Sequence, residues 1–156
     1  EFALEKGLPF VFAAQINADL AVPVLKMYRQ RFKPSVYLQE PKSILSIMVF
    51  TAETDEEAYY QAAPAILHWT LLTTGKSIVN PTFEEALSYK YSLQEEAVKQ
   101  NIMRKFVIGS PDKVAEKLSQ WAKETIVDEI IIFDLYSQME GRRKGYELLA
   151  KEFGLS

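Results

Sequence analysis

Three short apolar runs, separated by stretches with helical spacing, place the strongest constraint on the fold of this chain. The runs are residues 8–14 (LPFVFAA), 44–51 (ILSIMVFT) and 129–134 (EIIIFD). Each run reads as a buried strand of a parallel sheet, because apolar residues occupy both of its alternating faces. Since helical stretches lie between the runs, we predict β-α-β units with right-handed crossovers.

The clearest helix signal lies directly before the third run. Ser110 is a natural N-cap, Pro111 suits the first helical position, and Asp112 favours the positive end of a helix. The buried stripe of this helix is predicted to consist of Val114, Leu118, Trp121 and Ala122. The order is therefore a cap, an amphipathic helix, a short hinge and a strand.

Two other helices are bounded by proline or by their position in the chain. A helix that starts near Asp19 has Pro23 close to its first turn and ends before Pro34. Residues 142–154 (RRKGYELLAKEFG) are predicted to form the closing helix, directly after the third strand.

The middle of the chain carries a second capping signal. Thr54 and Glu57 have the spacing of a capping box, which predicts a helix to about Leu72. Pro64 lies deep inside this helix, so we expect a kink or a break there. Residues 84–100 are predicted to form one mostly polar helix.

The composition excludes several kinds of site. The chain has no cysteine and one histidine, His68, so thiolate sites, disulfides and histidine clusters lack their ligands. The net charge of −3 gives no reason to expect a nucleic acid partner. No apolar run approaches the ~20 residues of a membrane span. We therefore predict no metal, no nucleic acid, no membrane partner, and a cytoplasmic location.

The size and the edges of the predicted sheet suggest that neighbours are missing. The 156 residues suit one domain, but three parallel strands are too few to protect their own edges. The chain also starts without methionine, in what reads as the end of a helix before Gly7. We therefore expect a piece of a longer protein, and self-association of the isolated chain.

Five stretches, taken in order, resemble the C-terminal part of the luciferase-like flavin monooxygenases. They are GLPFVFA, YRQRFKPS, TAETDEEA, GSPDKVAEKL and YELLAKEFG, which lie between residues 7 and 154. Each stretch is weak alone, but all five occur in the family's order and at similar spacing. The likeness is closer to the bacterial oxidoreductase branch than to the light-emitting enzymes.

The resemblance implies an α/β fold that is a partial (β/α)8 TIM barrel. The whole chain, residues 1–156, would be the C-terminal portion of the barrel, with about strands six to eight and their helices. Residues 73–106 would be an inserted, lid-like helical segment. Because barrel enzymes keep their chemistry at the carboxyl ends of the strands, the site is expected there.

The resemblance also implies an enzyme, an FMN-dependent oxidoreductase. Such monooxygenases oxidise a small organic substrate with O2 and reduced flavin, which a separate reductase supplies. The chain alone is expected to be inactive and to need a homo-oligomer or a complementing N-terminal barrel half.

Two alternatives stay open at this point. The first is a non-catalytic, truncated barrel relative that binds flavin or an apolar ligand, or an inactive assembly fragment. The second is an independent three-stranded α/β domain with an unrelated function.

Residues at the ends of the three runs are the candidates for cofactor binding: Gln15, Phe50, Thr51, Asp134 and Tyr136. No catalytic residue is assigned. Close relatives often carry histidine where Gln15 stands, and an amide does not titrate, which argues against an acid–base role. Ile126 stands where relatives usually have glycine, so the helix before it is expected to end differently.

Three other groups are interpreted as structural. The acidic residues 53 and 55–57 suit a helix start, and the basic residues 142–144 suit a solvated helix face. An anion-binding role of the basic group stays open, because barrels often bind phosphate after strands seven and eight. His68 lies within a predicted helix and is interpreted as structural.

Overall fold

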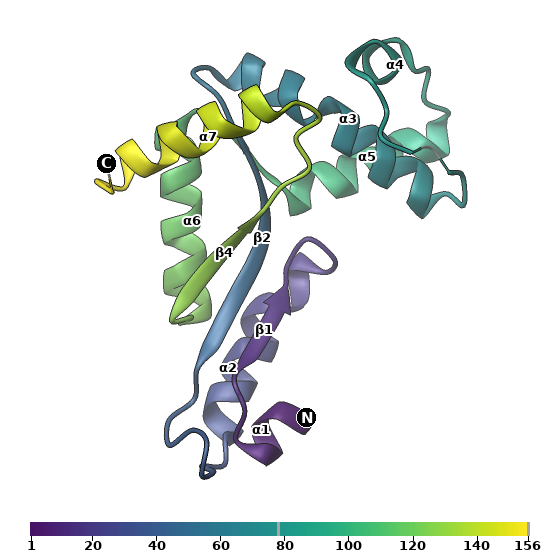
Figure 1. Cartoon of the computed structure of the whole chain (residues 1–156). Helices are drawn as coiled ribbons and strands as arrows, with labels where there is room; N and C mark the ends of the chain where they lie inside the picture. Colours follow the sequence, from purple (N-terminus) through teal and green to yellow (C-terminus); the bar gives the residue numbers. More distant parts are fainter. Residues whose placement is uncertain (78, 156) are drawn as a thin grey trace. The chain divides into compact units, whose positions relative to one another are not determined.

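The computed structural model describes residues 1–77 and 79–155 and contains helices and parallel strands (Figure 1). The elements in chain order are α1 (Phe2–Lys6), β1 (Phe10–Ala13), the 3-10 helix η1 (Ala18–Leu20), α2 (Ala21–Arg31), β2 (Ser43–Thr51), α3 (Asp55–Thr73), α4 (Phe83–Ser88), α5 (Leu93–Lys105), β3 (Val107–Gly109), α6 (Pro111–Thr125), β4 (Glu129–Phe133) and α7 (Met139–Glu152). The mixed α/β class is confirmed. The short strand β3 is an addition to the three predicted strands.

The chain divides into two compact units. Unit 1 comprises Glu1–Met48 and Lys117–Phe133, and unit 2 comprises Val49–Glu116 and the chain from Asp134 onward. The strand β2 and the helix α6 each contribute residues to both units. Each unit is described below by itself.

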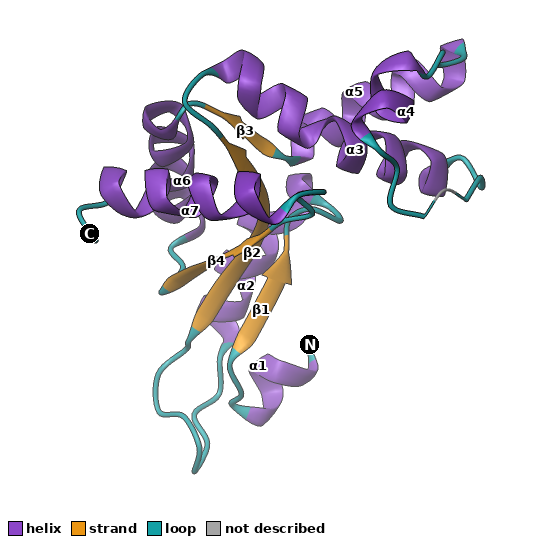
Figure 2. Ribbon diagram, turned by 45° about the horizontal axis from the view of Figure 1, so that its top comes forward, coloured by secondary structure: helices purple, strands orange, loops and turns teal. Residues whose placement is uncertain are grey.

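Unit 1 is built on three parallel strands, with β2 between β1 and β4 (Figure 2). Leu45 of β2 lies opposite Phe12 of β1 and Ile130 of β4. The parallel direction of all three predicted strands is confirmed. It follows from the helical crossovers α2 and α6, because parallel neighbours need a long connection.

The two faces of this sheet are covered very differently. Leu45 and Ile47 of β2 are buried, on the face to which their in-register neighbours on β1 and β4 also point. On the opposite face Val11, Ile131 and Phe133 are 51%, 43% and 38% exposed. Each outer strand pairs only with β2 in the described part of the chain. Unit 1 therefore leaves an apolar sheet face open.

A polar cluster joins the beginnings of β2 and β4 to α2. The Asp128 carboxylate accepts the Ser43 backbone N–H at 2.7 Å and pairs with the Arg29 guanidinium at 2.7 Å. The Arg29 hydrogen bond, opposed in part by desolvation, lowers the pKa of Asp128. The cluster holds the strand starts in register, because it links residues that lie 85 positions apart.

The helical excursion of unit 2 is fastened at its base. The end of β2 pairs in parallel with β3, and the Thr51 hydroxyl donates to the Gly109 carbonyl at 2.8 Å. Asp55, the first residue of α3, accepts the Ser110 backbone N–H at 2.8 Å and pairs with Lys113. The residues before and after the excursion α3–α5 are therefore held together.

The structure corrects the helix that was predicted over residues 84–100. Two helices, α4 and α5, replace it, and the chain between them is not helical. Each begins with a capping box, Thr82 with Glu85 and Ser92 with Glu95. Because the second capping box stabilises a new helix start at Ser92, two capped helices are favoured over one continuous helix.

α3 begins where it was predicted to begin and continues through Pro64. The Thr54 hydroxyl accepts the Glu57 backbone N–H at 3.1 Å, as predicted. Pro64 is buried inside α3, which runs from Asp55 to Thr73 as one helix, so the proline does not break it. The three residues that follow Pro64, Ala65, Ile66 and Leu67, are also buried.

The end of α6 differs from the prediction in an informative way. Ile126 has a φ of 56°, in the left-handed region that glycine occupies in helix-ending motifs. Its N–H donates to the Ala122 carbonyl at 3.0 Å. The expectation that isoleucine makes this helix end differently is therefore wrong. Ile126 takes the glycine conformation at a steric cost of about 1–2 kcal/mol.

This strain makes the usual ranking of alanine over glycine reverse at position 126. Ile126→Gly and Ile126→Ala remove nearly the same apolar atoms, but only glycine relieves the strain. We expect the glycine variant to have the higher free energy of unfolding, by about 1 kcal/mol in urea titrations. The matched control Ala122→Gly, inside α6, should lose about 1 kcal/mol instead. A more stable Ile126→Ala protein would contradict the assignment.

A buried carboxylate holds the three helices of the excursion together. Glu95 accepts hydrogen bonds from the Lys76 ammonium at 2.6 Å, the Tyr89 hydroxyl at 2.9 Å and the Ser92 backbone N–H at 2.8 Å. The Lys76 ammonium and the other two donors lower the pKa of Glu95 to about 2. The loop after α3, the end of α4 and the start of α5 therefore converge on one side chain.

Acid should weaken the hydrogen bonds that Glu95 accepts, because they depend on its ionised carboxylate. A carboxylate whose pKa is lowered on folding stabilises the protein above its ordinary pKa, and this stability is lost as the pH falls toward about 2. We expect Glu95→Gln to lower the urea midpoint at pH 7 and to flatten its decline between pH 4.5 and 2. Glu84→Gln, an exposed first-turn residue of α4, is the control. Equal acid profiles of wild type and Glu95→Gln would refute this role.

Candidate functional site

The carboxyl end of β2 meets the loop after β4 through one side chain. Tyr136 donates its hydroxyl to the Thr51 carbonyl at 3.0 Å and accepts the Thr51 backbone N–H at 2.7 Å. The phenol thus takes the position of a strand neighbour, since β4 ends at Phe133. Burial raises the pKa of Tyr136 to about 12, so the hydroxyl keeps its proton at neutral pH.

This contact needs a glycine on α7. A Cβ added at Gly145 would lie 2.6 Å from the Tyr136 hydroxyl oxygen and 3.1 Å from the Thr51 carbonyl oxygen. Any side chain at position 145 would therefore push the phenol off the strand end. The close approach of α7 to Tyr136 and Thr51 depends on this residue.

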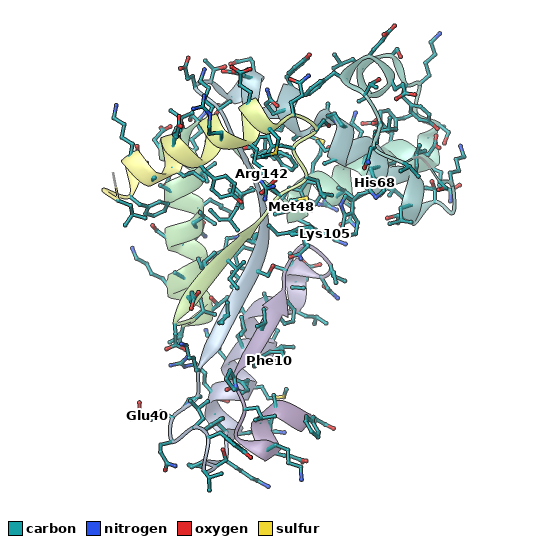
Figure 3. The ribbon with its side chains drawn as sticks, in the orientation of Figure 1. Phe10, Glu40, Met48, His68, Lys105 and Arg142 are labelled. Atoms are coloured by element: carbon teal, nitrogen blue, oxygen red, sulfur yellow. The ribbon has the colours of Figure 1, made fainter. Side chains whose placement is uncertain are left out.

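Asp134 fastens the other end of the same loop. Its carboxylate accepts the Tyr146 hydroxyl at 2.6 Å and pairs with the Arg142 guanidinium at 3.2 Å, both from α7 (Figure 3). The Tyr136 backbone N–H lies 3.4 Å from the second carboxylate oxygen. The Asp134 side chain is 4% exposed. The loop 134–138 is therefore held by ionic and hydrogen bonds at Asp134 and at Tyr136.

Next to this loop lies a cavity of about 420 Å³. Three segments of unit 2 form it: the middle of α3, the chain leading into α4, and the loop after β4. The described lining residues are Pro64, Ala65, His68, Asn80, Pro81, Thr82, Phe83, Leu135, Tyr136, Ser137 and Gln138. The volume lies within the range of small-molecule sites, about 300–1,000 Å³.

The walls of the cavity combine apolar and aromatic residues with neutral polar ones. The Phe83 ring stacks on the Tyr60 ring, with centroids 4.4 Å apart and planes 4° apart, which fixes its orientation. The Tyr136 ring is fixed by its hydroxyl bonds to Thr51. Among the described lining residues there is no aspartate, glutamate, lysine or arginine. The arrangement suits a ring-bearing organic molecule.

The predicted site residues of unit 2 lie together, but they are used differently. Phe50 is fully buried, with its ring centroid 4.9 Å from that of Tyr136 and 6.2 Å from that of Phe106. Thr51 is 1% exposed, and its hydroxyl and backbone groups bond within the protein. Of Phe50, Thr51, Asp134 and Tyr136, only Tyr136 lines the cavity.

Gln15 belongs to unit 1 and follows β1. Its side-chain oxygen is buried and has no hydrogen-bond partner within the described part of the chain. An unpaired buried amide oxygen is costly, about 1–3 kcal/mol, and is often found where a ligand or water bonds. The roles of all five residues in cofactor binding stay predictions.

Sequence reasoning did not predict most of the cavity lining. His68 was interpreted as structural, yet it lines the cavity from α3 (Figure 3). Phe83 and Asn80 lie beside the capping box of α4, in a stretch predicted to be part of a lid. The box T-x-x-E at residues 82–85 is a signal that could have placed Phe83 at a helix start.

Two further findings limit the kind of site. The described residues contain no group of three or more histidine, aspartate or glutamate side chains that could hold a metal ion. In the same part of the chain, no helix has the length and apolarity to cross a bilayer.

Comparisons with known proteins show which family the chain resembles. No protein-family profile matches the chain. YceB of Bacillus subtilis (strain 168), an uncharacterised protein, is 31% identical over 153 residues, 97% of this chain and 46% of YceB. The luciferase-like monooxygenase of Escherichia coli (strain K12) is 26% identical over 148 residues, 95% of this chain and 44% of that enzyme. The chain resembles the luciferase-like monooxygenases. It spans about half the length of the curated relatives that it matches.

Solved structures share the fold of this chain. The crystal structure of apo-MsnO8 has a TM-score of 0.83 and 26% identity, over 99% of this chain and 47% of MsnO8. The oxygenating constituent of 3,6-diketocamphane monooxygenase from Pseudomonas putida, solved in complex with FMN, has a TM-score of 0.56 and 18% identity. The match covers 97% of this chain and 43% of the Pseudomonas putida protein, and it supports the fold alone.

The lining of the cavity suits one part of FMN. Phe83 and Tyr136 offer aromatic surface, and Gln138 offers an amide, which suits an uncharged ring system. The described lining has no lysine or arginine to pair with the flavin phosphate.

Removing the Tyr136 hydroxyl should destabilise the site measurably. In Tyr136→Phe the Thr51 N–H and C=O stay buried without their partner, which we expect to cost about 1–3 kcal/mol of unfolding free energy. Tyr37→Phe, whose ring is 80% exposed, is the matched control and should stay within about 0.5 kcal/mol of wild type. Urea titrations compare the three proteins, and equal losses in both variants would contradict the role of Tyr136.

Proposed function

We propose that this chain is the C-terminal portion of an FMN-dependent luciferase-like monooxygenase, which oxidises an organic substrate with O2 and reduced flavin. The observation that carries the proposal is the collinear similarity to a luciferase-like monooxygenase over 95% of this chain but only 44% of that enzyme. A cavity of substrate size, lined in part by the loop that follows β4, supports it.

The open sheet face of unit 1 supports the barrel part of the proposal. In a barrel, one face of each strand points to the interior and both edges pair with neighbours. We propose that β1, β2 and β4 are strands six to eight, and that Val11, Ile131 and Phe133 face the barrel interior. The missing neighbours then come from an N-terminal barrel half. Residues 73–106, which include α4 and α5, act as part of a lid.

When bound and reduced, the flavin supplies the electrons with which one oxygen atom of O2 enters the substrate and the other becomes water. The protein part of the mechanism is binding, orientation and exclusion of water. The Tyr136 hydroxyl stays protonated at neutral pH and is bonded to Thr51, so Tyr136 offers its ring rather than an acid or base. Gln15, Phe50, Thr51, Asp134 and Tyr136 are the residues proposed to contact or support the flavin.

The partners and setting follow from the same proposal. A separate reductase supplies reduced FMN, and the flavin phosphate is held by residues outside the cavity described here. The chain alone is inactive, and it forms a homo-oligomer or joins an N-terminal barrel half in the cytoplasm. The open apolar face and the unpaired outer strands of unit 1 support such an association.

A non-catalytic binding protein is the second candidate. The observation that favours it is that the described lining residues of the cavity all belong to unit 2. A truncated relative with this unit would bind an apolar ligand or a flavin ring system and lack turnover.

The complete protein encoded by the gene provides the test. It is incubated with FMN, NADH and a flavin reductase, and flavin absorbance and oxygen uptake are measured, with the isolated chain as the control. The proposal expects FMN to co-purify with or bind to the complete protein, and oxygen uptake to exceed that of reductase alone. The isolated chain should show neither effect. Absence of both from the complete protein would rule out the monooxygenase and leave the binding protein.

A further inference from the structure

We propose that the cavity next to the loop 134–138 selects uncharged, ring-bearing organic molecules and rejects their carboxylate analogues. The proposal names a substrate class for the proposed function. Only the statement that the bound molecule is oxidised rests on that function. Ligand selection itself follows from the lining of unit 2. It can be measured by binding alone.

The size of the cavity sets the size of the ligand. A buried apolar cavity of about 150 Å³ is large enough to bind benzene. The cavity here, at about 420 Å³, is nearly three times larger. It therefore has room for a ligand of two or three fused or linked rings.

The shape of the walls favours flat rings. Phe83 is stacked on Tyr60, and Tyr136 is bonded to Thr51, so neither ring is free to swing out of the wall. Pro64 and Pro81 add rigid apolar surface from two different segments. A preformed apolar wall lowers the entropic cost of binding, because little has to be ordered when the ligand enters.

Charged side chains in the segments that flank the lining bond within the protein. The Glu85 carboxylate accepts both the backbone N–H and the hydroxyl of Thr82, at 2.8 and 3.0 Å. Arg142 and Tyr146 bind the Asp134 carboxylate from the side of α7. Because no lysine or arginine belongs to the described lining, a carboxylate entering the cavity would lose hydration without gaining a counterion.

Neutral hydrogen-bonding groups remain on the rim. Ser137 and Gln138 are exposed lining residues from the loop after β4, and Asn80 lies on the opposite segment. Gln138 precedes α7 as its N-cap residue but makes no side-chain capping bond, so its amide is available to a ligand. These groups match a ketone, hydroxyl or amide on an otherwise apolar molecule.

Two naphthalene probes of nearly equal shape test the selection. The full chain is titrated by calorimetry with 2-acetonaphthone, which is neutral, and with 2-naphthoate, its carboxylate analogue. Both titrations are made at pH 8, where free imidazole is neutral. We expect the ketone to bind at least about tenfold more tightly than the carboxylate. Equal affinities, tighter binding of the carboxylate, or no binding of either probe would overturn the proposal.

A charge variant locates the selection in this cavity. Gln138→Arg places a fixed cation in the lining, so naphthoate should gain affinity and the ratio of the two affinities should fall by about tenfold. Gln94→Arg adds the same charge to an exposed position of α5 outside the lining and should leave the ratio unchanged. If the two variants shift the ratio equally, the selection reflects net charge and the proposal fails.

A filled cavity completes the test. Ser137→Phe adds a ring at the exposed rim and should abolish binding of both probes, with circular dichroism and thermal midpoint checked against wild type. Ala65→Phe fills the cavity from α3 and serves as a second variant. Unchanged ketone binding in a folded Ser137→Phe protein would place the site elsewhere. The complete protein can fail to consume oxygen while the probe preference persists, which separates this proposal from the monooxygenase.

Discussion

The polar groups of Thr51 hold together the part of the molecule that surrounds the cavity. Its backbone N–H and C=O bond to the Tyr136 hydroxyl, and its own hydroxyl donates to the Gly109 carbonyl. Since Thr51 is 1% exposed, water cannot replace these partners, and each lost bond would leave a buried polar group unpaired. The loop after β4 and the far end of the helical excursion are both fastened to this residue. The loop after β4 is one wall of the cavity, so the cavity depends on Thr51.

The two units of the chain present different surfaces. Unit 2 lines a cavity from three segments, with Glu95 and Thr51 as buried hydrogen-bonding residues. Unit 1 instead presents Val11, Ile131 and Phe133 on an uncovered sheet face. Burying such surface is favourable by about 25 cal/mol per Å², so this face favours a covering partner. A chain that matches about half the length of its relatives is consistent with that difference.

Much of the local structure could be predicted because its causes are local. Ser110 precedes α6 and Pro111 is its first residue, as expected, and Thr54 caps α3 as expected. The prediction of one helix over residues 84–100 was wrong, although both capping boxes are visible in the sequence. The stretch is mostly polar, so it has no regular apolar spacing whose interruption would show where one helix ends and the next begins. The expectation for Ile126 was wrong for another reason. Its positive φ is imposed by the turn between α6 and β4, although isoleucine disfavours that conformation.

The sequence by itself determined the three predicted strands, their parallel direction and most of the helices, because periodicity and caps are local signals. Its composition excluded thiolate and histidine-cluster metal sites. It also placed Thr51 at the end of one strand and Tyr136 after another. Only the tertiary structure decided that these two residues, 85 positions apart, bond to each other and that His68, Phe83 and Gln138 share one cavity. Such contacts are the sum of many weak packing terms across the whole unit, and no short segment contains the information that selects them.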